Sequence, residues 1–229
     1  DPTAPERLLP GMLDDPGRDL RRDAVARALP GAGKDPERLK TLLADARDRD
    51  QVDAIVKQLK ELKVDVDVSS LYGVVTRWSL HKSFDNAGGR GFEIAYAPEK
   101  GERGAGQAAT TAPLGKIDLN AVLGKEKAVV AYAFAAIDVP DARPAEIRVG
   151  TNNAVKLFLN GVLLYARDEY HHGMKMDQYV GRAALKKGRN EILLKICQND
   201  QKEDWAQTWS FQARVCDALG GAVPFRILD

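Results

Sequence analysis

The spacing of apolar residues changes near residue 64, and this change most limits how the chain can fold. Before residue 64, β-branched residues are scarce and apolar residues recur every three to four positions. The best run is Val52, Ile55, Val56, Leu59 and Leu62. This spacing puts the apolar side chains on one face of a helix. Residues 1–64 are therefore predicted to form three or four short antiparallel helices, including one around Glu6 to Leu13.

Two Asp-Pro pairs predict where helices begin. Asp15-Pro16 and Asp35-Pro36 each have a side chain suited to the N-cap, followed by a proline suited to the first helical position. After the first pair, Pro30-Gly31 is predicted to end the helix.

From residue 64 the apolar period is two, which is typical of strands. The alternation starts at Val64, Val66 and Val68, and strand-length runs follow at 74–80, 128–136, 146–149, 154–159, 191–197 and 208–215. Turn residues bound these runs, as in an all-β sandwich or barrel. We therefore predict an antiparallel β-sandwich from about residue 68 to 217, in which 98–116 form a long loop with at most short strands.

The last of these runs predicts which face of its strand is buried. One face carries Trp209, Phe211, Ala213 and Val215, and the other carries Thr208, Ser210, Gln212 and Arg214. Such alternation is expected of a strand with one buried and one solvated face.

Two segments carry more specific signals. In the first, 155–164, Asn160-Gly161 separates two apolar strands, which predicts a two-residue hairpin turn. In the second, 185–196, Gly188 and Asn190 precede a strand whose Ile192, Leu194 and Ile196 share one side.

Together these segments resemble the galactose-binding-like jelly roll, the fold of many carbohydrate-binding modules and of sugar-binding domains attached to glycosidases. The resemblance implies a mainly β fold, a jelly-roll sandwich over 65–229, after a small helical part over 1–64. Many members hold a structural calcium, but this sequence has no clear acidic loop pattern for one. No fixed motif of the family marks its binding residues.

The stretches 8–16 and 20–26 resemble a HEAT-type helical repeat. Solenoid repeats are stable only when stacked, so these helices pack either on the next domain or on further repeats. Helical repeats followed by such a sandwich resemble regions of large exported bacterial proteins. The resemblance alone favours a periplasmic or extracellular location.

Charge and cysteine content exclude some functions. Lys and Arg number 34 against 33 Asp and Glu, so the chain lacks the basic excess of nucleic-acid-binding proteins. No window approaches the roughly 20 apolar residues of a membrane span.

Cys197 and Cys216 lack metal-ligand spacing. If their two strands are neighbours in a hairpin, the cysteines lie too far apart for a disulfide.

Aromatic side chains are the first candidates for stacking on a sugar ring. Trp209 and Trp78 are expected in the core, whereas Trp205 follows the polar run 199–204 and is expected to be exposed. Tyr170 belongs to a cluster of ligand-type residues: Asp168, Glu169, Tyr170, His171 and His172, with Asp177 close behind.

This cluster could hold a divalent metal only if a turn brought the two imidazoles together, since adjacent side chains in a strand point to opposite faces. A solvated loop is the favoured interpretation, and neither a metal nor a cofactor is expected. The candidate ligand-binding residues are Trp205, Tyr170, Asp168, His171 and His172.

No nucleophile elbow, zinc-protease motif or Cys-His pair is present, so an enzyme is not expected. The leading hypothesis is a non-catalytic carbohydrate-binding-like accessory module of a larger exported protein. The alternatives are a structural or protein-interaction module without a small-molecule ligand, and a cryptic glycoside hydrolase. Convergence of Trp205, Tyr170 and the 165–177 loop on one open face would favour the first.

Overall fold

The computed structural model describes residues 3–102 and 104–228 and divides the chain into two compact units. The first comprises residues 1–71 and 219–221, and the second comprises 72–218 and 222–229. In the described parts of both, no helix is long and apolar enough to cross a membrane.

The first unit is helical, as its apolar spacing predicted. Its elements are α1 (Ala4–Leu8), the 3₁₀ turn η1 (Leu9–Gly11), α2 (Arg18–Ala32), α3 (Pro36–Asp45) and α4 (Arg49–Glu61). The Asp35 side chain accepts hydrogen bonds from the backbone N–H groups of Glu37 and Arg38, so the predicted N-cap of α3 is confirmed. At α2 the prediction was wrong, because Gly17 is the N-cap and the helix continues through Pro30.

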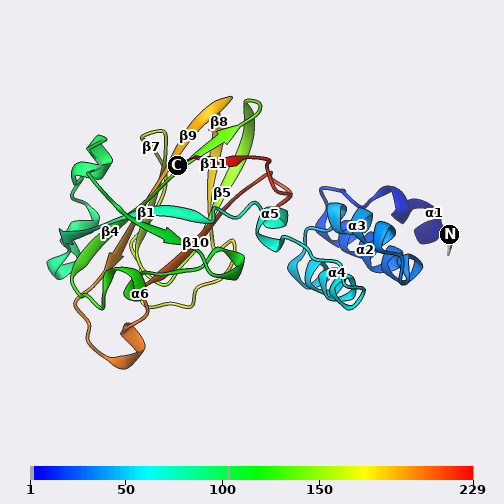
Figure 1. Cartoon of the computed structure of the whole chain (residues 1–229), viewed down its shortest axis with the longest axis horizontal. Helices are drawn as coiled ribbons and strands as arrows, with labels where there is room; N and C mark the ends of the chain where they lie inside the picture. The colour runs from blue at the N-terminus through cyan, green and yellow to red at the C-terminus, as the bar shows by residue number, and fades with distance from the viewer. Residues whose placement is uncertain (1–2, 103, 229) are drawn as a thin grey trace. The chain divides into compact units, whose positions relative to one another are not determined.

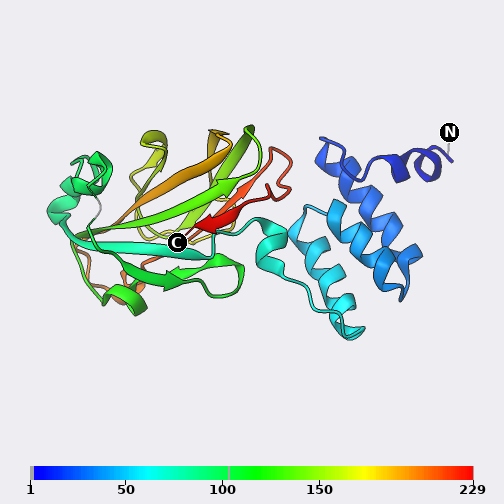
Figure 2. The same ribbon diagram turned by 45° about the horizontal axis from the view of Figure 1, so that its top comes forward.

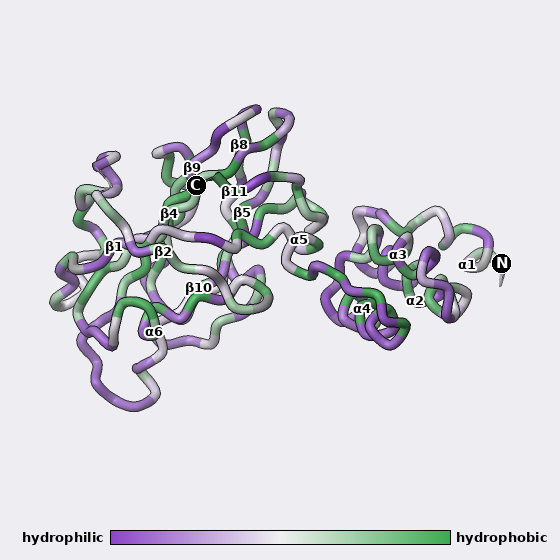
Figure 3. The backbone as a smooth tube through the Cα atoms, in the orientation of Figure 1, coloured by the Kyte–Doolittle hydropathy of each residue, from purple (hydrophilic) through white to green (hydrophobic). Residues whose placement is uncertain are grey.

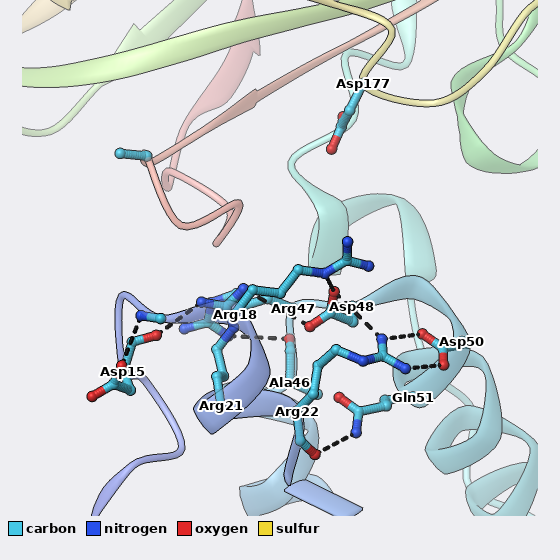
Figure 4. A network of polar contacts seen from close by, with 12 residues as sticks. Asp15, Arg18, Arg21, Arg22, Ala46, Arg47, Asp48, Asp50, Gln51 and Asp177 are labelled. Carbon is cyan, nitrogen blue, oxygen red and sulfur yellow. Dashed lines mark hydrogen bonds and ion pairs between the residues drawn. The ribbon is translucent and has the colours of Figure 1, made fainter. Parts of the chain in front are cut away.

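Asp48, the N-cap residue of α4, joins α4 to α2 through arginines (Figure 4). Its carboxylate lies 2.8 Å from Arg18 Nε and 3.5 Å from Arg22 Nη1. The Arg22 guanidinium also makes a two-pronged contact with Asp50. Opposite charge at the positive end of a helix is favourable, so Asp48 stabilises α4 while holding α2 against it.

The second unit is an antiparallel β-sandwich (Figures 1 and 2). A seven-stranded sheet has the order β2-β1-β4-β9-β6-β7, with β11 also paired to β4, and a four-stranded sheet has the order β3-β10-β5-β8. The strands are β1 (Arg77–Asp85), β2 (Gln107–Thr110), β3 (Ile117–Asp118), β4 (Val129–Val139), β5 (Arg143–Thr151), β6 (Val155–Leu159), β7 (Val162–Arg167), β8 (Tyr179–Leu185), β9 (Gly188–Gln198), β10 (Ser210–Cys216) and β11 (Arg226–Leu228). The predicted fold class, a mainly β antiparallel sandwich with a small N-terminal helical part, is confirmed.

Alternating side chains of the two sheets form one core. Trp209, just before β10, and Phe211, Ala213 and Val215 of β10 all belong to it, as their parity predicted. Trp78 lies in the same core, and its ring meets that of Phe211 edge-on at 5.2 Å. The small helices α5 (Val68–Tyr72) and α6 (Leu119–Leu123) complete the regular elements.

The outer face of β10 is covered, so the predicted solvated face was wrong. Ser210 is fully buried and Arg214 is 5% exposed. The segment 172–178 crosses this face so closely that a Cβ at Gly150 would lie 2.2 Å from the Lys175 carbonyl oxygen. Asp177 of this segment accepts hydrogen bonds from Arg214 and Arg148, and it thereby fastens the segment to the sheet.

The outer face of the seven-stranded sheet is partly covered by residues 86–102. This segment contains the short 3₁₀ elements η2 (Ala87–Phe92) and η3 (Ala97–Lys100). The fully buried Lys195 donates to the Phe92 and Ile94 carbonyl oxygens and forms an ion pair with Glu99 at 2.9 Å. A buried charge is tolerated only when it is paired in this way, so these contacts fix the segment in place.

The hairpin turn was predicted correctly from its local residues, but apolar alternation did not predict every strand correctly. Asn160 and Gly161, with φ of 51° and 81°, form the predicted two-residue turn between β6 and β7. In contrast, 64–67 contain no strand and Val68 begins α5, while β8 and β11 were not predicted.

The two cysteines are free, as predicted, but the proposed register was wrong. β9 pairs with β4 and β6, whereas β10 pairs with β3 and β5 in the other sheet. Cys197 and Cys216 are both fully buried.

Candidate functional site

Three segments that are distant in sequence meet at one end of the sandwich. They are the turn after β1, the β7–β8 loop and the β9–β10 loop. Asn86, which follows β1, donates a hydrogen bond to the Tyr170 hydroxyl at 3.1 Å. His171 in the β7–β8 loop bonds Asn199 in the β9–β10 loop at 2.6 Å. Antiparallel pairing brings these segments together, because β1, β7 and β9 all end there and β8 and β10 begin there.

Trp205 is the exposed aromatic side chain of this region. It lies in the 3₁₀ turn η5 (Asp204–Ala206) and is 61% exposed, as the sequence predicted. The surrounding loop is hydrophilic along most of its length (Figure 3). The His171 ring packs against Trp205 at a right angle, with centroids 5.3 Å apart and ring planes at 85°. Such edge-to-face pairs are favourable, so the indole is held while much of its surface stays open to solvent.

His171 is held in turn by its neighbours. Asn199 Oδ1 accepts from the Gln201 backbone N–H, which identifies it as the acceptor, so His171 Nε2 donates to it. The φ of His171 is 56°, in the left-handed region that few residues other than glycine adopt. Backbone strain of this kind is enriched at functional sites.

Tyr170 is half-buried beneath these residues. Its ring packs against the apolar cluster that contains Phe92 and Cys197, and its centroid lies 6.0 Å from that of His171. Burial raises the pKa of the Tyr170 phenol, and the Cys197 charge adds to the rise. Tyr170 is therefore a supporting wall of the site, whereas the sequence suggested a stacking ring.

His172 faces away from Trp205. Its Nδ1 lies 2.9 Å from Gln178 Nε2 and its Nε2 lies 3.1 Å from the Tyr179 hydroxyl. Gln178 Oε1 accepts from the Thr151 backbone N–H, so its amide donates to His172. These bonds fasten the β7–β8 loop to the four-stranded sheet.

Asp168 is exposed at the beginning of the same loop. Partial burial raises its pKa, and the negative charge of Glu93 adds to the rise while Lys156 opposes it. Within the part of the chain that the structure describes, no three His, Cys, Asp or Glu side chains gather as a metal site.

The structure brings together Trp205, His171 and Tyr170, and it places His172 and Asp168 beside them with other partners. Asn199 and Asn86 were not predicted as site residues. Asn199 opens the polar run before Trp205, which could have pointed to it. Asn86 follows β1, and nothing in its local sequence reveals its contact with Tyr170.

The sequence matches no protein-family model, and no curated protein is significantly similar to it. Solved structures that resemble part of the fold include three of different kinds. A β-glucosidase from Kluyveromyces marxianus aligns over 62% of this chain and 16% of its own, with a TM-score of 0.39 and 11% identity. An anti-sigma factor domain-containing protein from Clostridium clariflavum aligns over 67% of this chain and 44% of its own, with a TM-score of 0.39 and 11% identity. A PA14 sugar-binding domain from an RTX adhesin aligns over 67% of this chain and 96% of its own, with a TM-score of 0.38 and 14% identity.

The chain therefore spans less than half the length of the first two of these proteins. The sandwich that the galactose-binding-like resemblance implies is present. The HEAT-like resemblance of the first helices stays a prediction.

Proposed function

We propose that the sandwich is a non-catalytic carbohydrate-binding-like module that holds a glycan against Trp205. The observation that carries the proposal is a tryptophan, Trp205, that is 61% exposed and whose ring also packs at a right angle against His171. A tryptophan that only anchored its loop would bury its ring, because burial is the source of its stabilisation. An exposed but supported ring offers a flat apolar surface to the C–H face of a sugar.

Polar groups around the ring supply the second element of sugar recognition. Trp205 is preceded in sequence by Gln201, Lys202, Glu203 and Asp204, and Asp204 begins the same 3₁₀ turn. Amide and carboxylate groups are suited to sugar hydroxyls, which both donate and accept hydrogen bonds. The glycan would then lie across the β9–β10 loop with His171 behind the indole. In keeping with the sequence resemblance, we propose that the module serves a larger exported protein.

A glycan array tests this function. The whole chain should bind a subset of glycans, and incubation with those glycans should release no shorter products. Binding with product release would instead favour a glycoside hydrolase. No binding across the array, with a correctly folded protein by near-ultraviolet circular dichroism, would contradict the proposal and favour the protein-interaction alternative.

A further inference from the structure

The segment 87–102, called the strap from here on, covers the outer face of the seven-stranded sheet without adding a strand to it. Its backbone is hydrogen-bonded within itself, since the Glu93 N–H donates to the Arg90 carbonyl oxygen and the Glu99 N–H to that of Tyr96. These turns keep their hydrogen bonds whether or not the strap lies on the sheet. The strap can therefore leave the sheet as a unit.

Side chains from three strands hold the strap closed. Lys195 of β9 is fully buried and lies 2.9 Å from the Glu99 carboxylate, which also accepts a hydrogen bond from the Tyr132 hydroxyl of β4. Lys156 of β6 lies 3.1 Å from the Glu93 carboxylate. Hydrogen bonds to charged groups are stronger than neutral ones. The closed position therefore depends above all on Glu99, which is shared by two side chains of the sheet.

The strap also packs against the residues that support Trp205. Its backbone at Gly91 lies so close to Asn86 that a Cβ there would be 2.8 Å from Asn86 Oδ1. Asn86 is fully buried and donates to the Tyr170 hydroxyl at 3.1 Å. The Tyr170 ring packs against the apolar cluster to which Phe92 of the strap belongs. Opening of the strap would thus remove packing from both Asn86 and Tyr170.

Ring contacts continue from Tyr170 to the exposed indole. The Tyr170 and His171 centroids are 6.0 Å apart, and those of His171 and Trp205 are 5.3 Å apart. We propose that the strap opens and closes together with the β7–β8 and β9–β10 loops, so that Trp205 keeps its binding position only while the strap is closed. The regulation of glycan binding rests on the proposed function, whereas the coupled opening does not. The apparent affinity would then fall with the fraction of closed molecules.

Hydrogen exchange of the whole chain, read by mass spectrometry on peptic fragments, tests the coupling. In the native chain the strap and the fragments covering 168–172 and 203–207 should exchange faster than β4 and β9, because they open without global unfolding. Glu99→Gln removes the charge that pairs with Lys195 and should speed exchange about tenfold. All three segments should accelerate by the same factor, since one opening exposes them. Exchange in β4 and β9 should stay as in the native chain.

Glu102→Gln is the matched control, because it makes the same change at an exposed position of the strap and should leave every rate unchanged. If Glu99→Gln does not fold, Tyr96→Phe is the second loosening variant, since it removes a hydroxyl that donates to the Asp85 carbonyl oxygen. Acceleration of the strap alone would overturn the coupling, and native exchange of the strap as slow as that of β9 would overturn the separate opening. Neither measurement uses a glycan, so a failed glycan array and a failed coupling are distinguishable.

Discussion

The imidazole of His171 and the indole of Trp205 pack against each other at right angles, with the ring centroids 5.3 Å apart. The two residues belong to different loops, and the hydrogen bond from the His171 ring to Asn199 joins those loops. The position of Trp205 is thus fixed by packing between two loops and not by its own loop alone. The contact makes His171 a positioning residue for the proposed glycan site.

Removing the His171 ring should weaken glycan binding without unfolding the chain. His171→Asn is the suitable variant, because asparagine tolerates the left-handed backbone at this position. An aromatic edge contact is worth about 0.5–1.5 kcal/mol, so we expect affinity to fall roughly two- to tenfold in calorimetric titration. His172→Asn is the matched control, since His172 contacts Gln178 and Tyr179 instead. A larger loss in the control than in His171→Asn would contradict the assigned roles.

The hairpin turn at Asn160-Gly161 should be intolerant of a β-branched residue. Gly161 has a φ of 81°, which valine adopts only with strain, so Gly161→Val should destabilise the fold by about 1–3 kcal/mol. Gly104→Val is the control, because a Cβ at Gly104 meets open space and its φ is outside the left-handed region. Urea denaturation measures both variants. Equal midpoints for Gly161→Val and the native chain would mean that the turn lies elsewhere.

Asp177 should stabilise the fold at neutral pH and lose this effect in acid. Burial by itself raises the pKa of Asp177, but hydrogen bonds and charge from Arg214, with those of Arg148, outweigh it and hold the pKa below its ordinary value of 3.8. A carboxylate with a lowered pKa in the folded state contributes fully above its unfolded pKa. The contribution then disappears as the pH falls through the folded value.

Asp177→Asn should therefore cost about 3 kcal/mol at pH 7, because it leaves the buried Arg214 without its carboxylate. The difference from the native chain in urea midpoint should shrink as the pH is lowered from about 5 toward 2. Asp200→Asn, in the exposed part of the β9–β10 loop, is the control. A difference that stays constant across this range would exclude the ion pair as its source.

Both cysteines should be free and unreactive in the folded chain. Burial raises the pKa of Cys197 to about 12 and that of Cys216 to about 11, so few thiolates exist at pH 8. Thiol titration without reductant should find no reactive thiol in the native chain and two in denaturant. Two reactive thiols in the native state would contradict the burial of both strands.

The features that sequence predicted well depend on local geometry. The Asn160-Gly161 turn requires positive φ at adjacent residues, and few other pairs accept it. The parity of β10 predicted that Trp209 and Phe211 are in the core, because strand side chains alternate whatever the neighbouring strand is. The N-cap at Asp35 was predicted correctly because capping involves only the next three residues.

The features that sequence missed depend on what packs against each element. Arg214 has the parity of a solvated residue, yet the segment 172–178 covers it and Asp177 neutralises it. Val64 and Val66 alternate like a strand but have no partner strand, so no strand forms. The site itself was predicted as a set of residues, but its geometry was not. The contact between His171 and Trp205 exists only because the fold brings the β7–β8 loop and the β9–β10 loop together.

We propose that the exposed indole of Trp205 binds glycan while the buried indole of Trp209 only stabilises the core. Calorimetric titration and thermal melts of Trp205→Ala and Trp209→Ala test it most directly, with the glycan that the array selects. Trp205→Ala should lose binding and keep the native melting temperature, since the ring is 61% exposed. Trp209→Ala should lose about 3–5 kcal/mol of stability, because it empties a fully buried site. If Trp205→Ala binds the glycan as tightly as the native chain does, Trp205 is not the binding surface and the account is wrong.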